Sequence, residues 1–73
     1  MMGTRLEIIE RYAPQMGTFT TRQMASVVFG TVNASTIHGT YDRLCKLRRR
    51  GQMEKAGPAL IDGTWQMTWR WVA

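Results

Sequence analysis

Apolar residues recur at helical spacing through the first two thirds of this 73-residue chain and alternate strictly at its end. Leu6, Ile9 and Ala13 form one stripe of a first helix over residues 5–13. We expect Pro14 to end this helix, because the residue before a proline is pushed out of the helical region. A loop around Gly17 is then expected before the next helix.

The second helix has a clear start signal. Thr20 is followed three residues later by Gln23, which is the spacing of a capping box, and Gly30 is placed to end the helix. We expect its buried side to consist of Met24, Ala25, Val28 and Phe29.

The third helix is predicted over residues 33–50, with Asn33 or Ser35 as its N-cap and Gly51 directly after it. Its apolar seam is formed by Ile37, Tyr41, Leu44 and Leu47. The opposite side carries short polar groups and cations, namely Ser35, Gly39, Asp42 and Lys46, flanked by His38 and Arg43. Such a helix can approach a grooved anionic surface, of which DNA is the commonest.

The end of the chain is expected to form a β-hairpin. Residues 52–56 form a short strand, and residues 64–72 alternate with Trp65, Met67, Trp69 and Trp71 on one face. Gly57-Pro58 and Asp62-Gly63 are turn signals between the strands. We expect this face to cover the helices, with Trp65 and Trp69 in the core and Trp71 left open as an interface residue. The last strand is expected to be a sheet edge.

The formal net charge is +5, with ten Lys and Arg against five Asp and Glu. This balance favours an anionic partner, although many small proteins are basic for solubility alone. Six of the ten cations lie between residues 43 and 55, namely Arg43, Lys46, Arg48, Arg49, Arg50 and Lys55. Cations at the end of a helix also offset the macrodipole, which is an equally good explanation for Arg48 and Arg50.

Several classes of function are disfavoured by composition. Cys45 is the only cysteine, which excludes an intrachain disulfide and a cysteine-based zinc site. With one histidine, no Gly-rich phosphate loop and no nucleophile–base pair, we expect no enzyme, metal or cofactor. No run approaches membrane-spanning length and no signal peptide is evident, so we expect a cytoplasmic protein.

Two segments resemble bacterial winged-helix repressors. Residues 19–25 resemble the opening of the second helix in that family. Residues 41–51 resemble its third-helix signature, in which an aromatic residue and two leucines three apart precede a glycine and the first wing strand. The resemblance covers residues 20–73 and implies an α+β fold, a single winged helix-turn-helix domain over residues 1–73 with three helices followed by a hairpin wing.

The resemblance implies a small sequence-specific protein that binds double-stranded DNA, as a bacterial or phage transcription regulator with its third helix in the major groove. The base-reading residues it implies are Ser35, Thr36, His38, Gly39 and Arg43. The phosphate contacts it implies are Thr21, Arg22, Gln23, Lys46, Arg49 and Lys55.

A second interpretation follows from residues 57–63, the tip of the expected hairpin wing. This tip carries two aliphatic residues and no cation. The fold would then serve as a protein-interaction module, for example a phage-encoded inhibitor that binds a host protein complex. Its candidate interface residues are Leu60, Ile61 and Trp71. A homodimer is a further alternative, because a tryptophan-rich strand can also form a subunit interface.

Overall fold

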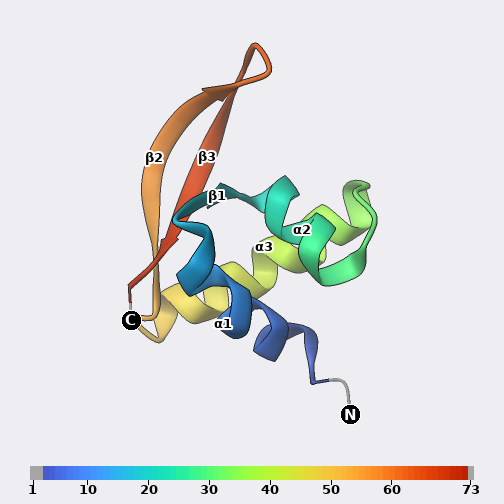
Figure 1. Ribbon diagram of the computed structural model, residues 1–73, viewed down its shortest axis with the longest axis vertical. Helices are drawn as coiled ribbons and strands as arrows, with labels where there is room; N and C mark the ends of the chain where they lie inside the picture. Colours follow the sequence, from blue (N-terminus) through green and yellow to red (C-terminus); the bar gives the residue numbers. More distant parts are fainter. Residues whose placement is uncertain (1–2, 73) are drawn as a thin grey trace.

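The computed structural model describes residues 3–72 and shows three helices and a three-stranded antiparallel sheet. The elements are α1 (Arg5–Met16), β1 (Thr18–Thr20), α2 (Thr21–Phe29), α3 (Ala34–Arg49), β2 (Met53–Ile61) and β3 (Thr64–Trp71). The expected α+β class is confirmed. Figure 1 shows the β2–β3 hairpin projecting away from the three helices. No helix within residues 3–72 has the length and apolarity needed to cross a membrane.

The helix start signals in the sequence are confirmed. Thr20 and Gln23 form a reciprocal capping box at α2, and Asn33 and Thr36 form another at α3. Gly30 adopts a left-handed conformation with φ of 73° after α2, as a C-terminal glycine does. Both helices are therefore fixed at their N-termini by hydrogen bonds within a few residues.

Pro14 does not end α1, contrary to the prediction. The helix continues to Met16 and stops at Gly17, whose φ is 67°. A proline so near the end of the helix removes only one hydrogen bond, while the extra turn keeps Ala13 buried and packs Met16 against the core. The short strand β1 that follows was not predicted, because three residues are too few to show an alternating pattern.

The buried face of α3 differs from the predicted seam. Leu44 and Leu47 are buried as expected, but Tyr41 is 42% exposed and Ile37 only half-buried. The N-terminal half of the helix instead buries Thr36 and Thr40. Counting threonines as polar hid this face, although a small side chain allows the close approach that α2 makes to α3.

The hairpin is longer than predicted, and Gly57-Pro58 is not a turn. Both residues lie inside β2, where a register shift between Lys55 and Gly57 marks a β-bulge. The chain reverses at Asp62 and Gly63, whose φ values of 52° and 77° are typical of a two-residue hairpin turn. A proline is tolerated in β2 because this is an edge strand.

β3 is the central strand of the sheet and not an edge, contrary to the prediction. The strand order is β1-β3-β2, and Phe19 of β1 pairs with Trp69 of β3. Both side chains are buried between the sheet and the helices. They belong to a core formed by Ile9, Ala13, Phe19, Met24, Leu44, Leu47, Met53 and Trp69.

Candidate functional site

One polar stripe runs along the whole exposed side of α3. Its members recur at steps of three, four, four and three residues, so they share one side of a 3.6-residue period. All five are exposed: Ser35, His38, Asp42, Lys46 and Arg49. We call this set the α3 stripe. It lies opposite the buried face of the same helix, so α3 presents polar groups and cations to solvent over its full length.

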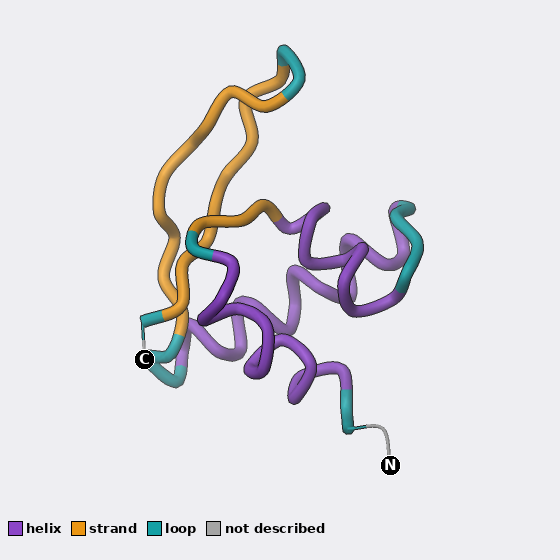
Figure 2. The backbone as a smooth tube through the Cα atoms, viewed as in Figure 1, coloured by secondary structure: helices purple, strands orange, loops and turns teal. Residues whose placement is uncertain are grey.

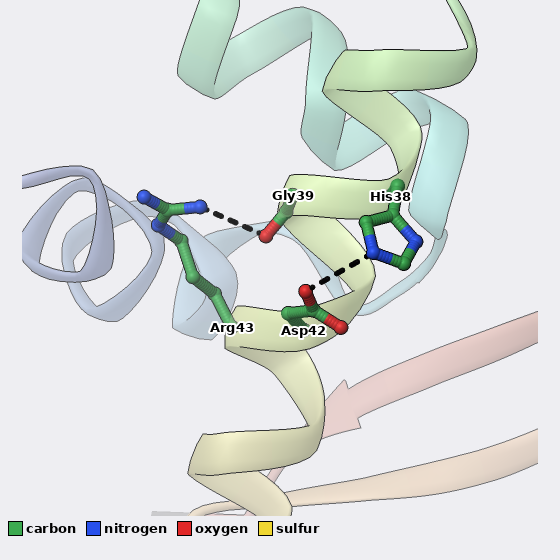
Figure 3. A network of polar contacts seen from close by, with 4 residues as sticks. All are labelled: His38, Gly39, Asp42 and Arg43. Atoms are coloured by element: carbon green, nitrogen blue, oxygen red, sulfur yellow. Dashed lines mark hydrogen bonds and ion pairs between the residues drawn. The ribbon is translucent and has the colours of Figure 1, made fainter.

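His38 and Asp42 pair within the stripe. Their Nε2 and Oδ2 atoms are 3.4 Å apart, and the side chains are 79% and 63% exposed. In Figure 3, this pair lies on one side of α3 and the Arg43 side chain extends to the other. An exposed pair at this spacing stabilises a helix only slightly, so both groups can exchange this contact for one with a ligand.

Arg43 folds back along α3. Its Nη1 donates a hydrogen bond of 2.9 Å to the carbonyl oxygen of Gly39, and its guanidinium carbon lies 5.9 Å from the centre of the Phe29 ring. A Cβ atom on Gly39 would meet this Nη1 at 3.3 Å and the Phe29 ring at 3.5 Å. The glycine therefore makes room for neighbours within the protein, and its backbone is half-buried.

A cleft of about 540 Å³ lies between the start of α1 and the polar side of α3. We call it the cationic cleft, because four of its lining residues are Arg5, Arg43, Lys46 and Arg49. Thr4, Leu6 and Asp42 complete the lining. Arg5 reaches it from α1, with its guanidinium carbon 4.6 Å from the centre of the Phe29 ring. Two arginines from different helices thus pack on one aromatic ring.

In the part of the chain that the structure describes, no ion pair involves the cations of the cleft, although Asp42 also lines it. Within residues 3–72 the ion pairs are His38–Asp42 and Glu54–Arg70, and neither involves the four cations. Arg5 is also the first residue of α1, where the positive end of the helix dipole disfavours a cation. Sequence reasoning missed Arg5, although a basic residue directly after an N-cap threonine was the signal that could have revealed it.

Three of the predicted contact residues are engaged in local structure. Thr36 is 8% exposed, and its hydroxyl bonds to the backbone of Asn33 in the cap of α3. The Thr21 hydroxyl accepts a hydrogen bond of 3.0 Å from Trp69 Nε1. The Gln23 side chain accepts one of 2.8 Å from the Thr20 amide. These groups are used to hold α2, α3 and the sheet in place.

Arg22 and Lys55 lie away from the cationic cleft. Arg22 lines a second cleft of about 470 Å³ with residues near the hairpin turn, namely Ile61, Asp62, Thr64 and Gln66. Lys55 Nζ lies 5.7 Å from the centre of the Trp69 ring. The structure therefore unites Arg43, Lys46 and Arg49 with Arg5 but does not add these two predicted contacts to the group.

The candidate interface residues differ in exposure. Leu60 is 59% exposed, whereas Ile61 is half-buried and Trp71 is half-buried against the core. Trp65, which we expected in the core, is 69% exposed because it lies on the part of the hairpin that extends past the helices.

Cys45 packs against the core, as expected for a lone thiol beside an apolar seam. A hydrogen bond with the Cys45 side chain raises the pKa of Tyr41 above its ordinary value. Tyr41 also meets the Trp69 ring edge-on, with 5.9 Å between ring centres. The Tyr41 hydroxyl therefore stays protonated near neutral pH, and its ring lies against the sheet.

The described part of the chain contains no group of three or more His, Cys, Asp or Glu side chains arranged to hold a metal ion. No protein-family model, no curated protein and no solved structure matches this chain.

Proposed function

We propose that this chain is a winged helix-turn-helix domain that binds double-stranded DNA, with the α3 stripe in the major groove. The order of helices, the sheet order β1-β3-β2 and the projecting hairpin support the winged-helix interpretation. The fold alone does not select a function, so the proposal rests on the surface of α3.

The observation that carries the proposal is the α3 stripe together with the cationic cleft beside it. A major groove about 12 Å wide admits one α-helix, and α3 presents hydrogen-bonding side chains to solvent along all of its exposed side. Two cations of the cleft, Lys46 and Arg49, belong to the stripe, and Arg5 and Arg43 lie beside it. Within residues 3–72 no ion pair holds these cations, so a backbone phosphate can bind them without breaking one.

The positions suggest distinct roles along α3. Ser35 and His38 are exposed at the N-terminal half, where recognition helices contact base edges, and Asp42 can accept from a cytosine amine. Lys46, Arg49 and Arg5 are placed to contact phosphates. Arg43 can donate two hydrogen bonds to the O6 and N7 atoms of a guanine if it first breaks its hydrogen bond to the Gly39 carbonyl. We assign no base contact to Thr36, because its hydroxyl is part of the helix cap.

The test is duplex binding over a range of salt, from about 50 to 300 mM, with a cleft variant and a matched control. Arg5→Gln with Lys46→Gln removes two charges from the cleft. Arg11→Gln with Arg50→Gln removes two charges from exposed positions that do not line it. We expect the cleft variant to lower the salt slope by about two units and the control to leave it nearly unchanged.

Sequence preference is tested by selecting retained duplexes from a random pool. Arg43→Ala is expected to weaken the selected site by about 1–3 kcal/mol and to relax its sequence preference. If the protein retains no duplex even at low salt, the proposal is wrong. The interpretation as a protein-interaction module is then favoured. If the cleft variant and its control lower the salt slope equally, only the net charge of the protein determines duplex binding.

A further inference from the structure

Half of the β2–β3 hairpin lies beyond the rest of the sheet. β1 pairs only with residues 68–70 of β3, so residues 58–67 form a two-stranded ribbon without a third strand. We call these residues the distal hairpin, and Figure 2 shows it extending past the helices. A two-stranded ribbon is marginally stable in water unless one of its faces is covered.

One face of the distal hairpin is apolar. Pro58 pairs with Met67 and Leu60 pairs with Trp65, and directly opposed residues project to the same face. Alternation along β3 makes this the face that Trp69 presents to the helices. The bulge between Lys55 and Gly57 keeps Pro58 and Leu60 on that face, because it inserts one extra residue into β2.

This face is covered at its base and bare at its end. Trp69 is fully buried, whereas Trp65, Leu60 and Met67 are 69%, 59% and 44% exposed. The exposed members of the face present on the order of 400 Å² of largely apolar surface, comparable with the largest patch on a typical monomer. A contiguous patch of this kind, here built by two adjacent cross-strand pairs, marks an interaction surface.

The charges on the hairpin fit a second copy of the same chain. Asp62 at the turn is the only charged residue of the distal hairpin. Lys55 lies toward the base on the Trp69 face, with its ammonium group near that ring. When two distal hairpins pack face to face and antiparallel, the turn of each lies at the border of the covered base of the other, where Lys55 is exposed. Asp62 of each copy then approaches Lys55 of its partner, which is the reciprocity that a two-fold axis requires.

We propose that this face is the dimer interface of the protein, with two distal hairpins packed antiparallel through Leu60, Trp65 and Met67. Two faces of this size bury about 800 Å² of mostly apolar surface, which is below the range of stable interfaces and typical of weak, transient ones. The dimer is therefore weak, with a dissociation constant of roughly 10–100 μM. Because Lys55, the cation on this face, does not line the cationic cleft, dimerisation leaves the cleft free for the proposed DNA binding.

The experiment is sedimentation equilibrium without DNA, from about 5 to 500 μM protein. The wild type is expected to shift from monomer to dimer across this range. Trp65→Ser is expected to raise the dissociation constant at least about tenfold, since interface tryptophans are common hot spots. Val27→Ser is the matched control, because it removes an apolar side chain that is 41% exposed on α2, and it is expected to dimerise like the wild type.

The circular dichroism spectrum of Trp65→Ser checks that the variant is folded, which we expect because the side chain is largely outside the core. A wild type that stays monomeric at every concentration would overturn the proposal. Equal weakening by Trp65→Ser and Val27→Ser would overturn it as well. If Trp65→Ser lowers duplex affinity and leaves the monomer–dimer equilibrium unchanged, the face contacts DNA and the dimer proposal is wrong.

Discussion

The cationic cleft and the distal hairpin are the two unusual surfaces of this molecule, and they differ in almost every property. The cleft gathers four cations from two helices, and two of them, Arg5 and Arg43, pack on one aromatic ring. The distal hairpin bears one carboxylate and a row of apolar side chains. Each is unfavourable in the isolated protein, because unpaired cations repel one another and exposed apolar surface orders water. The difference matches the two proposals, an anionic partner for the cleft and an apolar one for the hairpin.

The two ends of one sheet face also differ in how far they are buried. Trp69 and Trp65 occupy the same face of β3, four residues apart, yet one is fully buried and the other 69% exposed. At the base, the ring joins the core and donates a hydrogen bond to Thr21. Beyond the helices, the same type of side chain contributes no comparable burial to the stability of the monomer.

The largest expected effect compares these two tryptophans. Trp69→Ala should lower the free energy of unfolding by about 3–5 kcal/mol, since it opens a cavity in the core. Trp65→Ala should lower it by less than about 1 kcal/mol, because most of that ring is already in water. Denaturant unfolding, followed by circular dichroism at low protein concentration, measures both values. Equal losses would show that the distal hairpin is part of the monomer core.

Exchanging the charges of Asp62 and Lys55 tests the antiparallel arrangement of the proposed dimer. Asp62→Lys or Lys55→Asp alone places like charges opposite each other in two symmetry-related contacts. Each should raise the dimer dissociation constant about fivefold, as expected for exposed ion pairs. The double variant should regain most of the wild-type affinity. Sedimentation at matched concentrations makes the measurement, and a double variant as weak as the singles would contradict the antiparallel arrangement.

The smallest expected effect lies in the cleft. Arg5→Gln removes a cation from the first turn of α1, so the free energy of unfolding should rise by about 0.3–1 kcal/mol. The same change should weaken duplex binding and lower its salt slope by about one unit. Arg11→Gln, farther along α1, should change neither quantity appreciably. A variant that loses stability, or keeps full duplex affinity, would mean that Arg5 has a structural role.

Local signals were sufficient for the helix starts and for the hairpin reversal. The boxes at Thr20 and Asn33 close through hydrogen bonds to residues three positions away, and Asp62-Gly63 forms its turn through backbone preferences of two adjacent residues. Such features depend on nearby atoms alone, so the sequence determined them. The alternation in β3 likewise predicted which tryptophans share a face.

Only the tertiary structure decided which parts of each face are covered. A helical period shows that α3 has an apolar side, but the approach of α2 selected Thr36 and Thr40 for burial and left Tyr41 half in water. The length of the hairpin beyond the helices, and not the pattern of β3, exposed Trp65. Arg5 meets the cations of α3 across 38 or more residues of chain, a distance over which no local preference acts. The faces follow from local periodicity, and their contacts follow from how the elements pack.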